Sequence, residues 1–168
     1  MRPAGQVDKR FLMGMAVLTL VGFPLIGMAI VKIFSHFPIQ IMMRQRVSVV
    51  QQIAIGIPIG LAMGMISHYI SELRWIRPST IKYARRLQNF ELNRIDMILI
   101  SICAGFGEEL LFRGAIQIFW GIWPTAIVFV AIHGYLNPKD MRISAYGLMM
   151  TVFIGIMGYM MEYWGIWS

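Results

Sequence analysis

The chain has 168 residues, a length that suits one compact unit, and residues 1–168 are expected to form a single membrane domain. Hydrophobic residues make up 58% of the chain and charged residues 14%, with a mean hydropathy of +0.66. A soluble domain of this size lacks the interior to bury that much apolar surface, so the lipid bilayer is the expected solvent. The net charge of +7 comes from residues that lie between apolar runs, without a patterned basic and aromatic face. It therefore indicates a membrane surface, and no nucleic acid, as the partner.

Two long apolar segments come first, at about Phe11–Phe37 and Val47–Ile70. Each is long enough to cross a hydrocarbon core of roughly 30 Å. The first follows a basic start, but it is too long for a secretory signal core and lacks a small-residue cleavage site. We therefore predict a retained membrane-spanning helix there.

Residues 71–94 are polar and strongly basic, and they are expected to form a cytoplasmic loop that carries an interfacial helix. Thr80 is the predicted N-cap of this helix, because a threonine side chain can accept a hydrogen bond from the first turn. The loop is interpreted as a signal of topology and as a contact for lipid headgroups rather than as a substrate site.

The distribution of lysine and arginine predicts the orientation of the chain. If the N-terminus is cytoplasmic, the basic residues near it, the loop at 71–94 and the basic residues after position 138 all lie in the cytoplasm. Only Arg44 and Arg46 then lie clearly on the far side, which agrees with the positive-inside rule.

Three more apolar segments follow within residues 95–168, the part of the chain that carries the candidate motifs. The third runs from about Ile95 to Trp120, and the fifth from about Ile143 to Trp164. Between them, Pro124 suits the first turn of a shorter fourth helix, which Asn137-Pro138 is expected to end. The pattern as a whole predicts an all-α integral membrane bundle of about five transmembrane helices.

Two adjacent carboxylates stand in the third apolar segment, within "GFGEELLFRG". An ionised carboxylate at membrane depth costs at least a few kcal/mol, so such residues usually have a function. Glu109 and Arg113 are spaced i, i+4 and are expected to form an ion pair on one helix face. Glu108 points elsewhere and has no partner in its own helix, which makes it a candidate general base.

A histidine in the fourth segment is the second polar group at depth. Phe129 and His133, in "FVAIH", are also spaced i, i+4 and should share a face. If the third and fourth segments pack antiparallel across a tight turn at 121–124, Glu108 and His133 lie at similar depths. Such a group could deprotonate a water, or Glu108 and His133 could bind a divalent metal such as zinc that does so.

Two readings without hydrolysis remain open on these residues alone. The carboxylates, the arginine and the histidine could form a structural polar cluster that holds helices together. They could also act as an ion or proton relay in a transporter, although the chain has no internal repeat.

The motifs resemble those of a known family. "EELLFRG" is similar to the EExxxR motif of the CAAX-type prenyl endopeptidases, also called the CPBP family of intramembrane proteases, and "FVAIH" resembles its FxxxH motif. The segment "GLMMTVFIGIMGYMMEYWGIWS" resembles the helix that follows in relatives. The resemblance covers about residues 95–168 and implies an all-helical membrane hydrolase that cleaves peptide bonds.

By this resemblance each candidate residue has an implied role. Glu108 would be the base that activates water, with Glu109 beside it and Arg113 holding the glutamate geometry. His133 would orient the water or share its proton, and Phe129 would shape the substrate pocket. The implied substrate is a peptide or a membrane protein, because the minimal soluble parts suggest a bacterial cell membrane and bacteria do not generally prenylate.

Relatives also carry a third motif, a histidine followed four residues later by asparagine or aspartate, which stabilises the oxyanion. The sequence ends at Trp167-Ser168, where the helix with that motif would begin. The last core helix is thus expected to be missing, and a partner could supply it. A non-catalytic relative that serves as a peptide-immunity or scaffold protein is the alternative function.

Overall fold

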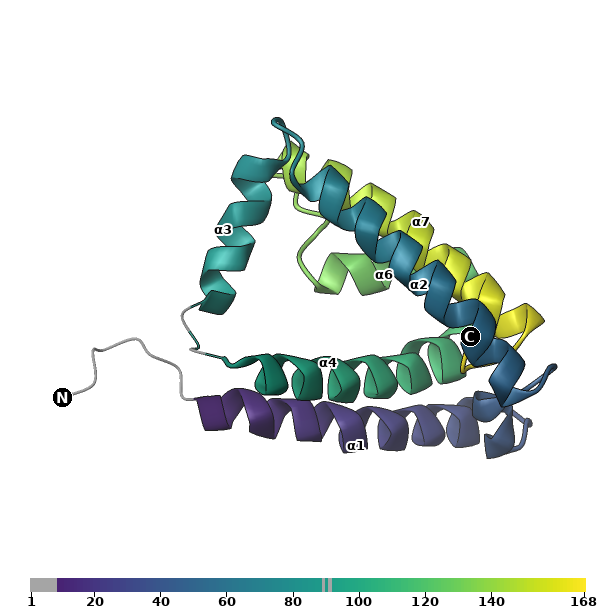
Figure 1. Cartoon of the computed structure of the whole chain (residues 1–168). Coiled ribbons are helices and arrows are strands. Elements are labelled where there is room, and N and C mark those ends of the chain that lie inside the picture. Colours follow the sequence, from purple (N-terminus) through teal and green to yellow (C-terminus); the bar gives the residue numbers. More distant parts are fainter. Residues whose placement is uncertain (1–8, 89, 91) are drawn as a thin grey trace.

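The computed structural model describes residues 9–88, 90 and 92–168. In this part of the chain the regular elements are helices, and the predicted all-α membrane bundle is confirmed (Figure 1). In chain order they are α1 (Lys9–Phe34), the 3₁₀ turn η1 (Ile39–Met43), α2 (Val49–Ser71), α3 (Arg77–Gln88), α4 (Arg94–Glu108), the π-helix η2 (Glu109–Ile116), α5 (Gln117–Trp120), α6 (Ile122–Ile132) and α7 (Met141–Tyr163).

Each of the five predicted apolar segments forms helix, but they are not equivalent. Three of the helices, α1, α2 and α7, are long and apolar enough to cross a bilayer. The third segment forms one helical run from α4 through η2 to α5, with a change of helix type inside it. The fourth, α6, has 11 residues and is about 16 Å long, too short to cross a core of roughly 30 Å.

The helices lie in two rows, and α3 connects one row to the other (Figure 1). Helices α1 and α4 run side by side in the same direction, and α2 lies beside α7. Helix α3 joins the far end of α2 to the start of α4, and α6 lies between the rows against α7. The starts of α1 and α4 are joined by an ion pair in which Lys9 Nζ is 2.6 Å from Asp96 Oδ2.

Helix α1 packs against α4 through a glycine. A Cβ atom built on Gly107 would lie 2.3 Å from the backbone oxygen of Thr19, so only glycine fits at this crossing. Close backbone approach at small residues is typical of membrane helix pairs. Gly105, two residues earlier and on the opposite face of α4, has no heavy atom within 4 Å of such a Cβ position.

The last residues return to the start of α2. Gln52 is fully buried, accepts a hydrogen bond from the Trp167 backbone N–H at 2.9 Å and donates one to the Val47 carbonyl oxygen at 2.9 Å. Gly165 has a φ of +134° and lies against the Gln52 side chain. These contacts hold the residues after α7 against α2.

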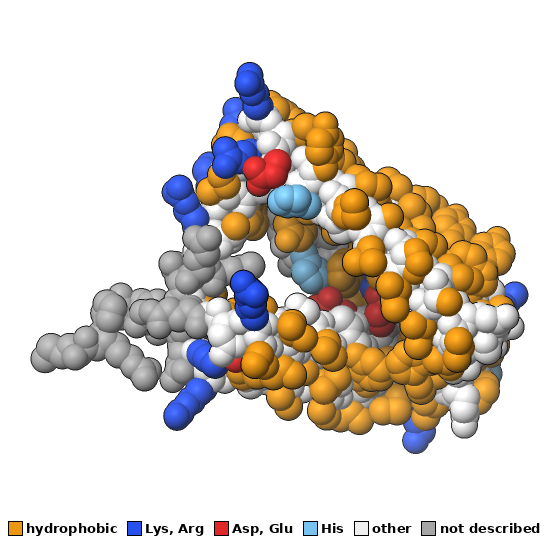
Figure 2. Space-filling model, in the orientation of Figure 1, with side chains coloured by type: hydrophobic (Ala, Val, Ile, Leu, Met, Phe, Trp, Pro, Cys, Tyr) orange, Lys and Arg blue, Asp and Glu red, His pale blue; other side chains and the backbone are white. Residues whose placement is uncertain are grey.

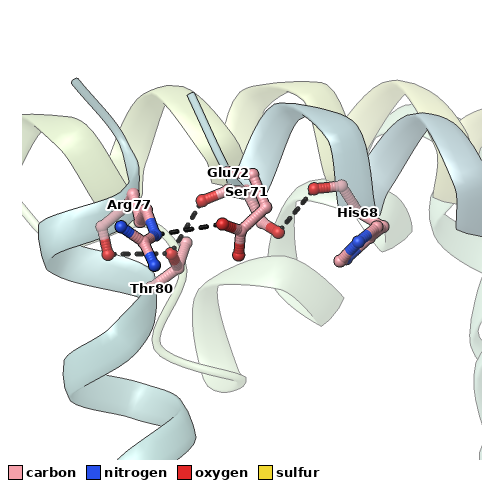
Figure 3. A network of polar contacts seen from close by, with 5 residues as sticks. All are labelled: His68, Ser71, Glu72, Arg77 and Thr80. Atoms are coloured by element: carbon pink, nitrogen blue, oxygen red, sulfur yellow. Dashed lines mark hydrogen bonds and ion pairs between the residues drawn. The ribbon is translucent and has the colours of Figure 1, made fainter. Parts of the chain in front are cut away.

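The basic loop contains the predicted helix, but its start was predicted wrongly. Helix α3 begins at Arg77, and Thr80 lies in its first turns rather than at its N-cap. The Thr80 hydroxyl donates to the carbonyl oxygens of Arg77 (3.1 Å) and Ser71 (3.0 Å), while Glu72 pairs with the Arg77 guanidinium (Figure 3). Thr80 therefore ties α3 to the end of α2 instead of capping a helix.

Helix α6 ends earlier than Asn137-Pro138. His133 is its C-cap, and the chain turns at Gly134, which has a φ of +79° that favours glycine. The Tyr83 hydroxyl of α3 donates to the Gly134 carbonyl oxygen at 3.2 Å. Pro124 does lie in the first turn of α6, as predicted.

Candidate active site

The site begins where α4 changes into the π-helix. Glu108 is the last residue of α4 and Glu109 the first of η2. The six residues from Leu110 to Ala115 are all buried, because α1, η1 and α6 pack around this segment. A π-helical segment in a longer helix often marks a functional site, because the wider turn re-aims its side chains. The sequence pattern predicted an ordinary α-helix here.

The predicted ion pair of Glu109 and Arg113 is confirmed. Arg113 Nη1 lies 2.9 Å from Glu109 Oε1, and the exposed fractions of the side chains are 2% for the arginine and 27% for the glutamate. Arg113 Nη2 is 3.9 Å from the Met157 sulfur of α7, and its Nε–H is buried without a hydrogen-bond partner. The guanidinium is therefore held by one carboxylate at the centre of the bundle.

Phe129 of α6 lies between the arginine and the histidine. The Arg113 guanidinium carbon is 5.0 Å from the centre of the Phe129 ring, within the range of a cation–π contact. The ring centre is also 4.3 Å from that of His133 and 5.0 Å from that of Phe112, which it meets edge to face. Phe129 and His133 thus share a face, as predicted.

Glu108 and His133 are close together, as the antiparallel packing predicted. His133 Nε2 lies 3.6 Å from Glu108 Oε1. His133 Nδ1 is 2.7 Å from the Phe129 carbonyl oxygen, which can only accept, so Nδ1 carries a hydrogen. The second nitrogen, Nε2, is then left facing the carboxylate of Glu108.

Both side chains are partly exposed. Glu108 is 21% exposed and His133 34% exposed, although both lie among apolar helices. The face drawn in Figure 2 is hollowed between the row of α4 and the row of α2 and α7, and acidic and histidine side chains gather in this hollow. The bundle therefore combines a buried arginine with partly exposed acid–base groups.

The residues fit a resident zinc ion poorly. Catalytic zinc sites use three protein ligands, and the residues that the structure describes include no group of three or more histidine, cysteine, aspartate or glutamate side chains placed to hold a metal. The expected metal ligands, Glu108 and His133, supply two donor groups.

Sequence reasoning missed two residues of the cluster. Phe112 packs on Phe129, and Met157 of α7 contacts Arg113. Phe112 lies inside the EExxxR segment and could have been found there. Met157 is one of 15 methionines in an apolar chain, and the sequence carries no signal that distinguishes it.

Comparisons with known proteins find matches for the part of the chain that carries both motifs. Residues 90–168 match the family described as type II CAAX prenyl endopeptidase, Rce1-like. The uncharacterised protein YpbD of Bacillus subtilis (strain 168) is 30% identical over 69 residues, which cover 41% of this chain and 34% of that protein. The aligned part thus spans about a third of that relative. No solved structure matches the chain. Residues 90–168, which contain both motifs, are therefore similar to the Rce1-like type II CAAX prenyl endopeptidases.

Proposed function

We propose that this membrane protein is an endopeptidase that hydrolyses a peptide bond with a water activated by Glu108 and His133. The observation that carries the proposal is the pairing of Glu108 Oε1 with His133 Nε2 at 3.6 Å, with the hydrogen of the imidazole fixed on the other ring nitrogen. The match of residues 90–168 to a peptidase family supports the same chemistry.

A water would be held between these two groups in the state where Glu108 is ionised and His133 is neutral. An ionised Glu108 oxygen and a neutral Nε2 of His133 are both acceptors, so a water between them donates one hydrogen to each. Its lone pairs then point away from both groups, toward a substrate carbonyl carbon. As the water attacks, Glu108 takes one proton and can later give it to the departing amine.

The other residues of the site would position Glu108 and His133. The Phe129 carbonyl oxygen fixes the imidazole by accepting from Nδ1, and the Phe129 ring covers one face of it. Arg113 holds Glu109 beside Glu108 and lies over the other part of the Phe129 ring. Phe129 would therefore link the arginine–glutamate pair to the histidine, and shape the wall that a substrate meets.

The substrate class follows from the surroundings of the site. The hollow opens among apolar helices, so a peptide or membrane-protein segment with apolar side chains is the proposed substrate. The site lies at the end of the short α6, and with a cytoplasmic N-terminus the hollow would face the cytoplasmic side.

The test is peptide cleavage by the purified chain in detergent, with a library of labelled apolar peptides. We expect Glu108→Gln to lower the cleavage rate by about 10² to 10⁴, the range for removal of a general base. Glu72→Gln, which changes a half-exposed glutamate in the turn after α2, is the matched control and should leave the rate unchanged. Equal product from wild type and Glu108→Gln would refute the assignment.

A further inference from the structure

A second polar cavity lies on the other side of Arg113. It has a volume of about 320 Å³ and is lined mainly by residues of η1, the π-helix, α5 and α7. Its polar lining comes from Arg44, Arg113, Gln117 and Glu162, and its remaining walls are mostly apolar. Glu108 and His133 do not line this cavity, so the proposed catalytic water and the cavity are separate.

Two arginine nitrogens in the lining lack partners. The Nε–H groups of Arg44 and Arg113 are both buried without a hydrogen-bond acceptor, and the Arg113 side chain is only 2% exposed. Buried donors nearly always have partners, because an unmade hydrogen bond retains its desolvation cost. Two arginines with incompletely bonded guanidinium groups line this cavity, and their charge favours an anionic group in it.

The cavity also holds an acid. Glu162 Oε1 accepts a hydrogen bond from Gln117 Nε2 at 3.4 Å. Within the described residues no ion pair joins Glu162 to Arg44 or Arg113, although all three side chains line the same space. A simple anion would satisfy the arginines but would be repelled by Glu162. A ligand with both a negative and a positive group would satisfy all three.

A separate, apolar cavity is lined by other residues of the same stretch of helix. Its volume is about 410 Å³, and it is lined by Ile30, Phe34, Ile116, Phe119 and Trp120. The residues that line the two cavities are interspersed along the chain: Ile116 precedes Gln117, and Trp120 precedes Gly121. An occupant with a charged head and a hydrocarbon chain fits this arrangement.

We propose that the two cavities bind one zwitterionic phospholipid with a primary ammonium headgroup, of the phosphoethanolamine type. The phosphate oxygens accept hydrogen bonds from the guanidinium groups of Arg44 and Arg113, which suit phosphate geometry well. The ammonium donates to Glu162, and an acyl chain lies over Phe34 and Trp120. Arg113 then has a carboxylate on one edge and a phosphate on the other.

Three common lipid headgroups can distinguish this proposed site from a site that binds any anion. A glycerol headgroup offers the phosphate but no cation for Glu162. A choline headgroup offers a cation without N–H donors, so it cannot donate to the carboxylate. Of these three headgroups, only ethanolamine supplies both a phosphate acceptor and an N–H donor for Glu162.

The test is native mass spectrometry of the full chain in detergent, with phosphatidylethanolamine, phosphatidylglycerol and phosphatidylcholine of identical acyl chains. We expect one retained lipid per chain and the strongest retention for phosphatidylethanolamine. Arg44→Gln should weaken retention of phosphatidylethanolamine and phosphatidylglycerol alike, by about tenfold, as for a lost charge-assisted hydrogen bond. Glu162→Gln should remove the preference for phosphatidylethanolamine over phosphatidylglycerol.

Controls keep the result interpretable. Arg46→Gln changes an exposed arginine two residues from Arg44 and should leave retention unchanged. Arg44→Lys keeps the charge without the guanidinium and should give intermediate retention if Arg44→Gln is poorly folded. Equal retention of the three lipids would overturn the proposal, as would full retention by Arg44→Gln. Competition by phosphoethanolamine or inorganic phosphate as strong as that by the intact lipid would identify a free-anion site and overturn the lipid assignment.

Discussion

Two glutamate–arginine pairs in this molecule have nearly the same geometry in different surroundings. Glu109 and Arg113, in the π-helix, are 2.9 Å apart, and Glu72 and Arg77, after α2, are 3.0 Å apart. The first pair has side chains that are 27% and 2% exposed, and the second has side chains that are 52% and 56% exposed. Figure 3 shows the exposed pair among the hydroxyls of Ser71 and Thr80.

The comparison shows that the distance between the charged groups does not determine how much an ion pair stabilises the fold. An exposed pair gains little, because water screens it and competes with it. A buried pair has already lost its hydration, so removal of one partner strands a charge without water. The same kind of ion pair thus joins two helices loosely at one end of the bundle and holds a buried charge at its centre.

The largest expected effect is the difference in stability between replacing the buried arginine and replacing the exposed arginine of the two pairs. Arg113→Gln should lower the free energy of unfolding by about 3 kcal/mol, because Glu109 loses its partner while it stays largely buried. Arg77→Gln should cost under about 1 kcal/mol. Denaturant unfolding in detergent measures both. Equal losses would show that burial does not distinguish the two pairs.

The histidines beside the two pairs should differ in activity. His133→Gln is expected to lower peptide cleavage by about 10², because the ring no longer shares the proton of the activated water. His68→Gln, at the end of α2, should leave cleavage unchanged. Steady-state kinetics with the best library peptide give both rates, and circular dichroism checks that both variants fold. Normal cleavage by His133→Gln would remove the imidazole from the mechanism.

Two glycines of α4 test how tightly the buried pair is enclosed. Gly107→Ala should destabilise the chain by about 1 to 3 kcal/mol, because a new Cβ would clash with the α1 backbone. Gly105→Ala meets no atom within 4 Å and should be neutral or slightly stabilising. Thermal unfolding in detergent compares the two. A tolerated Gly107→Ala would mean that α1 can move away without cost.

The smallest expected effect concerns an acid at the exposed end. The Ser79 hydroxyl donates to Asp140 at 2.9 Å, and this hydrogen bond, with those from the backbone N–H groups of Ile143 and Arg142, lowers the pKa of Asp140 from 3.8. The resulting stability is therefore present above pH 3.8 and is lost as the pH falls through the lowered pKa.

Asp140→Asn should thus show a smaller loss of stability than wild type on acidification from about pH 5 to about pH 2. Unfolding midpoints across that range are the measurement, and Ser79→Ala is the companion variant, because it removes the largest cause of the shift. Identical acid profiles for the three proteins would contradict the assignment.

The residues that meet in the candidate site could be predicted from the sequence. Spacing alone predicted the Glu109–Arg113 pair, and an antiparallel arrangement across Gly121 predicted that Glu108 and His133 meet. Both contacts depend on short-range periodicity and one tight turn, which composition and spacing report well. The orientation in the membrane and the roles in catalysis stay predictions.

Other features depend on long-range packing that local patterns do not encode. The π-helix forms where six consecutive residues are buried by three different elements, so its cause lies outside the motif. The end of α6 depends on Gly134 and its contact with Tyr83 from α3, and the proline signal at Asn137-Pro138 was the wrong one. Thr80 was predicted as a cap because local sequence does not show that one of its two acceptors, the Ser71 carbonyl oxygen, lies in another helix.

The shortness of α6 has a consequence for how hydrolysis can occur among lipids. A helix of 11 residues stops about halfway through a hydrocarbon core, so the backbone after His133 must stay hydrated or bonded at that depth. Under the proposed function, these hydrated residues after His133 would also be the route by which the hydrolytic water reaches the site. On the proposed function, the reach of that one helix would set how far below the membrane surface the cleaved peptide bond lies.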